Sequence, residues 1–314
     1  MGVRVKAPSR IHITLIDLNG NIGRVDGGVG LALENPYIEL VARESENVVI
    51  KGDFENRERF AEIAEKFREK FGMGIEIDIR ESFPSHVGLG SGTQISLAVG
   101  RAYTEINEIE MSVREIAEFT GRGGTSGIGV AVFERGGFIV DGGHSRKLKS
   151  SFLPSSFSRA PPPPVIARYD FPGWEVHLFV PEEKGFAGLK EKDLFERSTP
   201  LRIDEVRELS HIILMKLMPS VVEQDLDEFA RAVYRIQHLG FKKAEVSQYG
   251  EVAWGFIELL KDHGAVGLSS TGPTLYFIGP RKSAKEGKRY LEDQGVEFNY
   301  IRTEARNRGA EIGV

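Results

Sequence analysis

A glycine-rich segment at residues 84–94, with the sequence PSHVGLGSGTQ, constrains this chain more than any other feature. Apolar residues alternate over 75–79 before it, as in a strand, and recur at helical spacing over 95–106 after it. Glycines between a strand and a helix let backbone N–H groups approach a ligand, and the helix N-terminus favours an anion. The segment therefore predicts a phosphate site, whose candidate residues are Gly88, Gly90, Ser91, Gly92 and Thr93.

This loop differs from two common phosphate-binding motifs. No Lys-Ser or Lys-Thr pair follows its glycines, and Thr93 stands where the dinucleotide-binding pattern needs a third glycine. A tight turn capped by Ser or Thr is the alternative. Residues 267–274 form a second hydroxyl-rich segment that suits a phosphate, although Ser-Thr-Gly-Pro is equally typical of a hairpin. Its candidate binding residues are Ser270, Thr271 and Gly272.

The composition excludes several classes of protein. The 314 residues are 40% hydrophobic and 28% charged, which is typical of a folded globular chain long enough for two domains. The net charge of −5 offers no basic field for nucleic acid, and the absence of cysteine excludes disulfides and thiolate metal sites. No apolar run is long enough for a membrane helix. We therefore expect a cytoplasmic protein without nucleic-acid or membrane partners.

The periodicity along the chain predicts two domains of an α+β protein. Residues 1–160 contain short alternating strands, the glycine loop and its helix, and residues 130–133 are expected to pair with 137–140 as strands. The four prolines at 161–164 predict a stiff spacer at the domain boundary. Residues 161–314 follow the order strand, helices, two strands, helix and strand, which is typical of a ferredoxin-like unit with extra helices.

Three segments carry a resemblance to a known superfamily. Residues 7–12, 84–94 and 267–274 are similar, in order and spacing, to the three motifs of the GHMP kinases, and the match covers almost the whole chain. The resemblance implies the GHMP two-domain fold. That fold has an N-terminal β-rich domain with the glycine loop and its helix, followed by a C-terminal ferredoxin-like α/β sandwich with extra helices.

Four further segments, residues 9–18, 23–30, 121–129 and 137–144, resemble the β-ribofuranosylaminobenzene 5′-phosphate synthases of methanopterin biosynthesis. The resemblance implies that phosphoribosyl diphosphate condenses with 4-hydroxybenzoate or 4-aminobenzoate, releasing diphosphate and CO₂ without ATP. Gly92-Thr93-Gln94 replaces the small Ser-Ala run of the kinases, and the third segment lacks a cation. An ATP-dependent GHMP small-molecule kinase is the alternative, and a ligand sensor without turnover is a third.

The implied reaction assigns candidate roles to several acidic residues. Mg²⁺ is the expected cofactor, because a hard divalent ion commonly bridges phosphate oxygens and a carboxylate. Its candidate ligands are Asp17 and Asp26, and these two acids, like Asp141, are also candidates for binding a ribose hydroxyl; Asp141 is a further candidate for Mg²⁺. Each of these acids has the alternative of capping a glycine-rich turn.

Basic residues are expected to bind the benzoate and to move protons. A guanidinium can hold a carboxylate through two hydrogen bonds, and Arg122 is the first choice over Arg10 and Arg24. His144 is the candidate general base, so the expected catalytic set is His144, Asp141 and Arg122. The expected substrate-binding residues near the N-terminus are Ser9, Arg10, His12 and Arg24.

Two further expectations concern the surface. The charged segment at residues 181–193 is interpreted as a solvated loop, with a lid over the site as the alternative. The partners expected are phosphoribosyl diphosphate, a para-substituted benzoate and a second copy of the chain in a homodimer.

Overall fold

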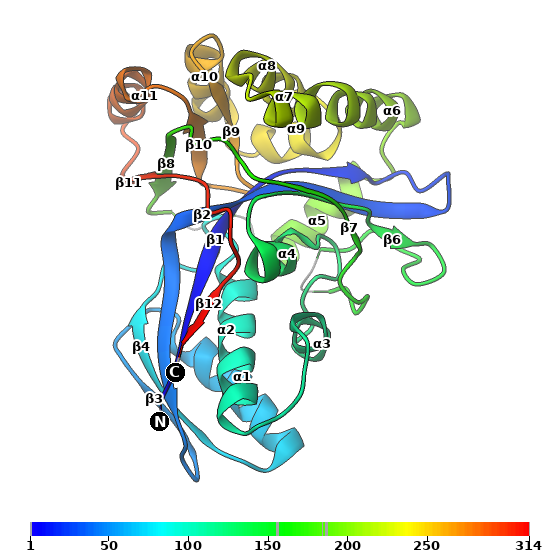
Figure 1. Ribbon diagram of the computed structural model, residues 1–314. Coiled ribbons are helices and arrows are strands. Elements are labelled where there is room, and N and C mark those ends of the chain that lie inside the picture. Colours follow the sequence, from blue (N-terminus) through cyan, green and yellow to red (C-terminus); the bar gives the residue numbers. More distant parts are fainter. Residues whose placement is uncertain (1, 155–156, 184, 186–187, 314) are drawn as a thin grey trace.

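The computed structural model describes residues 2–154, 157–183, 185 and 188–313. Figure 1 shows two lobes. In the lower lobe a sheet is covered on one face by helices α1 (Arg57–Phe71) and α2 (Ser91–Ile106), whereas the upper lobe has a smaller sheet and a layer of helices. A long hairpin of β1 (Val3–Asp17) and β2 (Arg24–Arg43) runs up the lower lobe and then along the base of the upper one.

The first sheet is built around this hairpin. Its strand order is β12 (Glu311–Gly313), β1, β2, β4 (Ile75–Glu81) and β3 (Val48–Lys51), with β5 (Phe138–Asp141) and β6 (His144–Ser145) also paired to β2 and β7 (Val165–Tyr169) paired to β5. Sequence alternation predicts several short strands where the structure has two long ones. Register shifts between Pro8 and Ser9 and between His12 and Thr14 interrupt the alternation in β1. Such bulges turn side chains away from the regular strand direction.

The helix predicted over residues 95–106 is confirmed as α2, and the other helices of the lower lobe have clear local signals. Helix α1 ends at Gly72, which adopts a left-handed conformation with a φ of 81°. Helix α3 (Val113–Phe119) begins with the capping box that Ser112 and Glu115 predict. The aromatic rings between the helices are closely packed, with 4.7 Å between the ring centroids of Phe67 and Phe119.

One predicted strand is wrong. Residues 130–133 lie in helix α4 (Ile128–Arg135), which packs on the first sheet. A short apolar run has no period that separates a buried strand from a buried helix. Gly30 in β2 allows α4 to pack closely on this strand, since a Cβ there would lie 2.4 Å from Ile128 Cγ2.

The second sheet confirms the ferredoxin-like interpretation of the C-terminal half. It is antiparallel, in the order β11 (Phe298–Thr303), β8 (Val176–Pro181), β10 (Leu275–Ile278) and β9 (Ala265–Leu268). Its helices and helical segments are α5 (Leu189–Ser198), α6 (Ile203–Ile212), the π-helical η1 (Ile213–Leu217), α7 (Met218–Glu223), α8 (Leu226–Gln237), α9 (Gly240–Ser247), α10 (Gly250–Leu260) and α11 (Arg281–Asp293).

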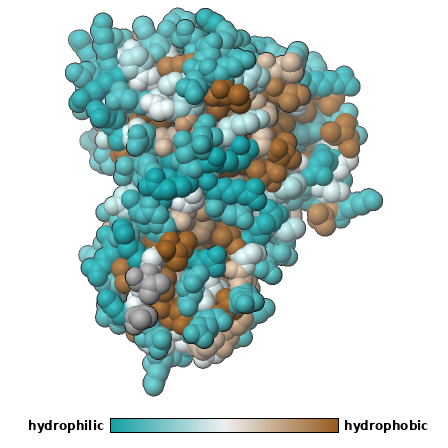
Figure 2. Space-filling view, in the orientation of Figure 1, coloured by the Kyte–Doolittle hydropathy of each residue, from teal (hydrophilic) through white to brown (hydrophobic). Residues whose placement is uncertain are grey.

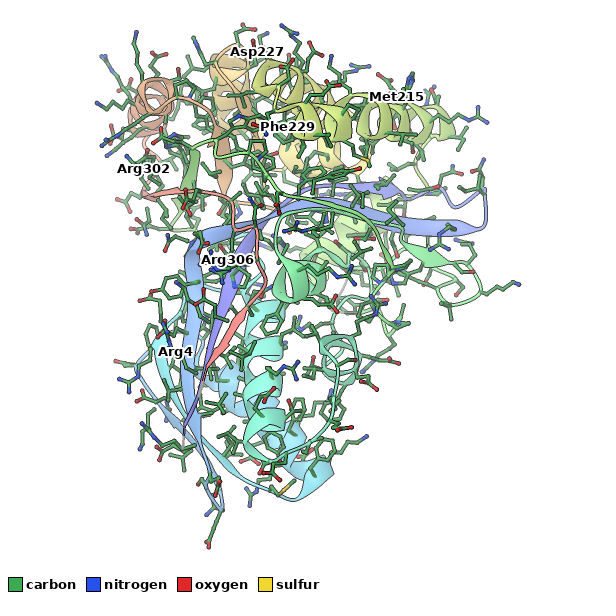
Figure 3. The ribbon with its side chains drawn as sticks, viewed as in Figure 1. Arg4, Met215, Asp227, Phe229, Arg302 and Arg306 are labelled. Atoms are coloured by element: carbon green, nitrogen blue, oxygen red, sulfur yellow. The ribbon has the colours of Figure 1, made fainter. Side chains whose placement is uncertain are left out.

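The prolines at 161–164 are packed against the first lobe, which differs from the stiff spacer expected there. Arg114 donates hydrogen bonds to the carbonyl oxygens of Pro162 and Pro163, and the bond to Pro163 O is 3.1 Å long. Strand β7 follows in the first sheet, beyond the predicted boundary at residue 160. The C-terminal segment also returns to this sheet, where buried Arg306 pairs with Glu34 at 2.7 Å (Figure 3).

Hydrophilic residues cover most of the face in Figure 2, with apolar groups on both lobes. Leu214, Met215 and Val222 are exposed on the helical layer of the upper lobe, where Figure 3 labels Met215. Within the described residues, no helix has the length and apolar character to cross a membrane. The homodimer stays a prediction.

Candidate active site

The three segments that resemble the GHMP kinase motifs meet between the lobes. The Arg10 N–H donates to Leu89 O at 3.1 Å, which ties β1 to the glycine loop. The His12 N–H donates to Ser269 Oγ at 3.1 Å, and the Ser270 N–H donates to His12 O at 2.9 Å. Residues 9–12, 84–94 and 267–274 therefore form one interlocked structure.

Close backbone approach explains why the loop needs glycine at position 88. Gly88 has a φ of +83°, and a Cβ there would lie 2.4 Å from Ser269 O. Its carbonyl oxygen accepts hydrogen bonds from the Arg10 guanidinium and, at 2.8 Å, from the Ser269 hydroxyl. A side chain at this position would push the third segment away from the first.

The N-terminus of α2 opens onto a polar pocket that we call the outer pocket. Its N-cap is the left-handed Gly90, and no side chain caps the helix. Arg122 lies beside this end, because a Cβ at Gly92 in the first turn would lie 3.5 Å from its guanidinium nitrogens, and its Nε donates to Ser96 Oγ at 3.2 Å. The outer pocket is lined by four arginines and by loop residues, namely Arg10, Arg59, Arg122, Arg159, Ser85, His86, Gly88, Gly90, Ser91, Gly92, Thr93, Thr120, Gly121, Ser158, Gly188, Glu191, Ser270, Thr271 and Gly272. Helix N–H groups and guanidinium groups together suit a polyanion.

A second pocket adjoins the first, and we call it the inner pocket. It combines apolar and polar walls, formed by Arg10, His12, Leu15, Thr93, Thr125, Ser126, Gly129, Pro154, Glu191, Phe195, Glu245 and Ser270. The residues common to both pockets are Arg10, Thr93, Glu191 and Ser270. Leu15, Pro154 and Phe195 form its apolar wall.

Buried charges support the floor between the pockets. Lys242 donates to Leu268 O at 3.1 Å and to Ser270 O at 3.0 Å, and its Nζ lies 2.5 Å from Glu245 Oε2. Burial lowers the pKa of Lys242 and raises that of Glu245, while their mutual attraction opposes both shifts. Burial also lowers the pKa of Arg10 to about 10. Lys242 thus places a cation below the third segment, whose own sequence has none.

His12 contacts Ser126, and both residues line the inner pocket. Its Nε2 lies 3.1 Å from Ser126 Oγ, and a Cβ at Gly28 would lie within 3.2 Å of both atoms. Burial lowers the pKa of His12 well below its usual value, and the charges of Arg10 and Lys242 lower it further. The ring is therefore neutral near pH 7 and suits hydrogen bonding to a neutral hydroxyl or amine.

Comparisons with known proteins identify the family. Residues 58–137 match the GHMP kinases N terminal domain, and residues 217–297 match the GHMP kinases C terminal family. A beta-ribofuranosylphenol 5′-phosphate synthase of Archaeoglobus fulgidus is 58% identical, over 99% of this chain and 100% of that protein. The chain belongs to this synthase family. A synthase of the same name from Methanocaldococcus jannaschii is 44% identical, over 98% of this chain and 99% of that protein.

The fold of this synthase family member is that of the GHMP kinases, as expected. A phosphomevalonate kinase of Streptococcus pneumoniae has a TM-score of 0.68 at 12% identity, over 96% of this chain and 99% of that one. A homoserine kinase of Cytophaga hutchinsonii has a TM-score of 0.65 at 15% identity, over 99% and 97% of the two chains. At these identities the likeness establishes the fold alone. The kinase alternative therefore describes the superfamily to which the fold belongs and no more.

His144 and Asp26, predicted as base and metal ligand, lie together outside both pockets. His144 Nδ1 is 2.6 Å from Asp26 Oδ2, and its Nε2 is 2.8 Å from Pro161 O. Lys149 Nζ lies 3.1 and 3.0 Å from the two Asp26 oxygens and also donates to Thr125 Oγ1 at 3.0 Å. All three ionisable side chains are almost fully buried. Lys149 thereby holds Thr125, which lines the inner pocket, and both ring nitrogens of His144 have partners away from the pockets.

Asp141 and Asp17 are occupied by backbone N–H groups. Asp141 is fully buried and accepts hydrogen bonds of 3.0 Å from the N–H groups of both Gly127 and Gly143. Burial raises its pKa to about 7, although these two hydrogen bonds oppose the shift. Asp17 Oδ1 accepts from the Asn19 and Gly20 N–H groups at 2.8 Å, as a turn cap does. Asp141 and Asp17 thus fix backbone beside the pockets and line neither.

Other predicted residues divide between the pockets and their surroundings. Arg24 donates to Gly142 O and Gly143 O, so it braces a turn and lines neither pocket. Ser9 is fully buried behind the loop, with no hydrogen-bond partner for its Oγ among the described residues. The structure brings the remaining predicted residues to the pockets, namely Arg10, His12, Gly88, Gly90, Ser91, Gly92, Thr93, Arg122, Ser270, Thr271 and Gly272.

Sequence reasoning missed the acidic residues of the pockets. The sequence predicts a solvated loop for Glu191, but this residue lies in α5 and lines both pockets. A signal exists in the sequence, because Phe195 follows Glu191 at helical spacing and lines the inner pocket as well. Lys242 and Glu245 are similarly spaced, with apolar Phe241 and Val246 beside them, which is typical of a buried ion pair.

Proposed function

We propose that this chain transfers the ribosyl 5-phosphate group of phosphoribosyl diphosphate to 4-hydroxybenzoate or 4-aminobenzoate, releasing diphosphate and CO₂. The 58% identity to a named beta-ribofuranosylphenol 5′-phosphate synthase, over 99% of this chain and 100% of that protein, carries this proposal. A cationic outer pocket that joins an inner pocket with an aromatic wall supports it. No step of this reaction requires ATP.

The proposed reaction balances without a further reactant. The bond from ribosyl C1 to the diphosphate oxygen breaks, and its electron pair leaves with diphosphate. The ring carbon that bears the carboxylate then bonds to C1, activated by the para hydroxyl or amino group. The carbon–carboxylate bond breaks, CO₂ leaves, and its electron pair restores the aromatic ring. Water must be kept from C1 throughout, because it would hydrolyse the sugar.

The outer pocket suits the diphosphate. Arg122 and the uncapped N-terminus of α2 present positive charge to it, and both favour an anion most strongly when water is excluded. Arg122 was expected to hold the benzoate, but its place beside this helix end favours phosphate oxygens. It contributes by stabilising the charge that grows on the leaving group.

The inner pocket suits the benzoate. Phe195 offers a face for the ring, and neutral His12 with Ser126 can hydrogen-bond the para substituent. Arg10 lies where the two pockets join and suits the carboxylate. Its guanidinium also donates to Gly88 O, so its pairing with the carboxylate is shared and does not oppose decarboxylation strongly.

We keep Mg²⁺ in the proposal because diphosphate commonly binds a divalent ion. Asp26 does not fit as its ligand, because Lys149 and His144 occupy its oxygens. Asp17 is committed to a turn through one oxygen and lines neither pocket. In the described part of the chain no cluster of three or more acidic or histidine side chains is arranged to hold a metal. We therefore derive no step through a metal.

Replacing Arg122 by alanine is expected to lower kcat/KM for phosphoribosyl diphosphate by about ten- to a hundredfold, because the interaction strengthens as the leaving group gains charge. A hydrogen bond to a charged group contributes about 1.5–3 kcal/mol, and each 1.4 kcal/mol is about tenfold in affinity. The KM for the benzoate should change little. Steady-state kinetics checks this, with Arg289→Ala on exposed α11 as the control. A larger effect on the KM for the benzoate would indicate that Arg122 binds the benzoate carboxylate instead.

Turnover without ATP tests the proposed function. The protein is incubated with Mg²⁺, phosphoribosyl diphosphate and 4-hydroxybenzoate or 4-aminobenzoate labelled in the carboxyl group. Equal amounts of labelled CO₂ and diphosphate are expected. Folded protein that releases neither, or that transfers phosphate from ATP to an alcohol instead, would overturn the proposal.

A further inference from the structure

The junction of the two pockets contains a carboxylate. Of the four residues that line both pockets, Arg10, Thr93 and Ser270 are cationic or hydroxylic, and Glu191 is acidic. Glu191 lies in the first turn of α5, which packs on α9. An acid is unexpected in a site for two anionic substrates, because it repels both unless positive charge develops next to it.

The proposed reaction develops such a charge at the same place. Diphosphate occupies the outer pocket and the benzoate occupies the inner one, so the ribosyl group that moves between them must lie at their junction. Loss of diphosphate before bonding to the ring leaves an oxocarbenium-like sugar, with positive charge shared by C1 and the ring oxygen. A fixed carboxylate is the group that stabilises such a cation in other sugar-transferring sites.

We infer that Glu191 stabilises the positive charge that forms at ribosyl C1 during transfer. This inference rests on the proposed function and assigns Glu191 as a catalytic residue of that site. It requires the ionised carboxylate, since a neutral amide or acid has no charge to offer. The carboxylate forms no bond to the sugar in this account, and the electron pairs move as described for the reaction.

The groups that face Glu191 determine its ionisation. Arg10 from β1 favours the ionised form of Glu191, whereas Glu245 from α9 disfavours it. Glu245 is itself paired with Lys242. Burial and the charge of Glu245 raise the pKa of Glu191 to about 7, and Arg10 opposes this shift. Glu191 thus loses its proton as the pH rises through about 7, and the rate should rise over the same range.

A purely structural role for Glu191 predicts a different outcome. Arg10 also faces Glu245. When Glu191 is neutralised, Arg10 therefore still has an acidic neighbour. Glutamine has nearly the shape of glutamate and should preserve the fold, as should Glu196→Gln, a control on the exposed side of the same helix. Only the charge-stabilising role predicts a selective loss of kcat and of its pH dependence.

Wild type, Glu191→Gln, Glu191→Asp and Glu196→Gln are compared for CO₂ and diphosphate release from pH 6 to 9. We expect Glu191→Gln to lower kcat about a hundredfold or more, with KM values within about threefold, an unchanged melting temperature and no rise near pH 7. Glu191→Asp keeps the charge and should retain more activity than Glu191→Gln. Glu196→Gln should match wild type.

Two results would overturn the inference. A Glu191→Gln enzyme within about threefold of an active wild type, or one at least as active as Glu191→Asp, would remove the need for a charge and leave the proposed function intact. A folded wild type that releases neither CO₂ nor diphosphate would overturn the proposed function and this inference together.

Discussion

Replacing Lys149 by methionine is expected to lower the free energy of unfolding by about 3–5 kcal/mol, because it removes one partner of a buried ion pair. Lys149 Nζ contacts both Asp26 oxygens, Thr125 Oγ1 and Leu153 O, all at 3.0–3.1 Å. Methionine matches the length of the side chain but removes its ammonium group, so Asp26 stays buried beside His144 without the lysine. Equilibrium unfolding in urea, followed by tryptophan fluorescence, measures the loss.

The same network also holds a strained backbone. Asp26 has a φ of 68°, a left-handed conformation that a residue other than glycine adopts only when its surroundings impose it. The Lys149→Met protein should therefore also lose order around Thr125 and with it benzoate affinity. Lys147→Met, an exposed change two residues away, is the control. Equal stability of the two variants, within about 0.5 kcal/mol, would show that the network does not support the fold.

Replacing Gly88 by alanine is expected to lower kcat/KM at least a hundredfold. The new Cβ would lie 2.4 Å from Ser269 O and 3.0 Å from Gly272 O, so the glycine loop and the third segment must separate. Displacement of reacting groups by about 1 Å commonly costs about a hundredfold in rate. The left-handed φ of +83° adds about 1–2 kcal/mol of backbone strain. Kinetics with both substrates and thermal unfolding report the two effects separately.

The Gly72→Ala variant separates the effect of backbone strain from the effect of close packing around a new Cβ. Gly72 has a similar φ of +81°, but nothing lies within 4 Å of the position of a Cβ there, and it caps α1. Its alanine variant should lose stability and keep wild-type kinetics. If Gly88→Ala kept wild-type kinetics too, close packing of the glycine loop on the third segment would not be needed for activity.

Periodicity predicted most elements because their packing follows their sequence pattern. Helix α1 and strand β4 each have one apolar face, and local capping ends α1 and begins α3. Strands β1 and β2 were predicted as shorter pieces, because the bulges near Ser9 and His12 break the alternation. The sequence predicts a strand where helix α4 lies, since the apolar run there is buried and too short to show a period.

The candidate site was only partly predictable, for a physical reason. Glycines and hydroxyl residues at helix ends and turns have local signals, and these led to the loop at 84–94 and the segment at 267–274. The roles of acids and histidines depend on which residues lie opposite them across the fold. Asp26 meets His144 and Lys149 only through tertiary packing, so its sequence neighbours could not separate a metal ligand from a buried ion pair. Glu191 was missed for the same reason.

The structure of the product tests the central claim most directly. Phosphoribosyl diphosphate labelled with ¹³C in the ribose and 4-hydroxybenzoate labelled with ¹³C in the ring are incubated with the protein and Mg²⁺, without ATP. Carbon NMR should show a one-bond coupling between ribosyl C1 and the ring carbon that carried the carboxylate. A product that keeps its carboxylate and joins the sugar through oxygen, or a substrate that changes only when ATP is added, would contradict the account.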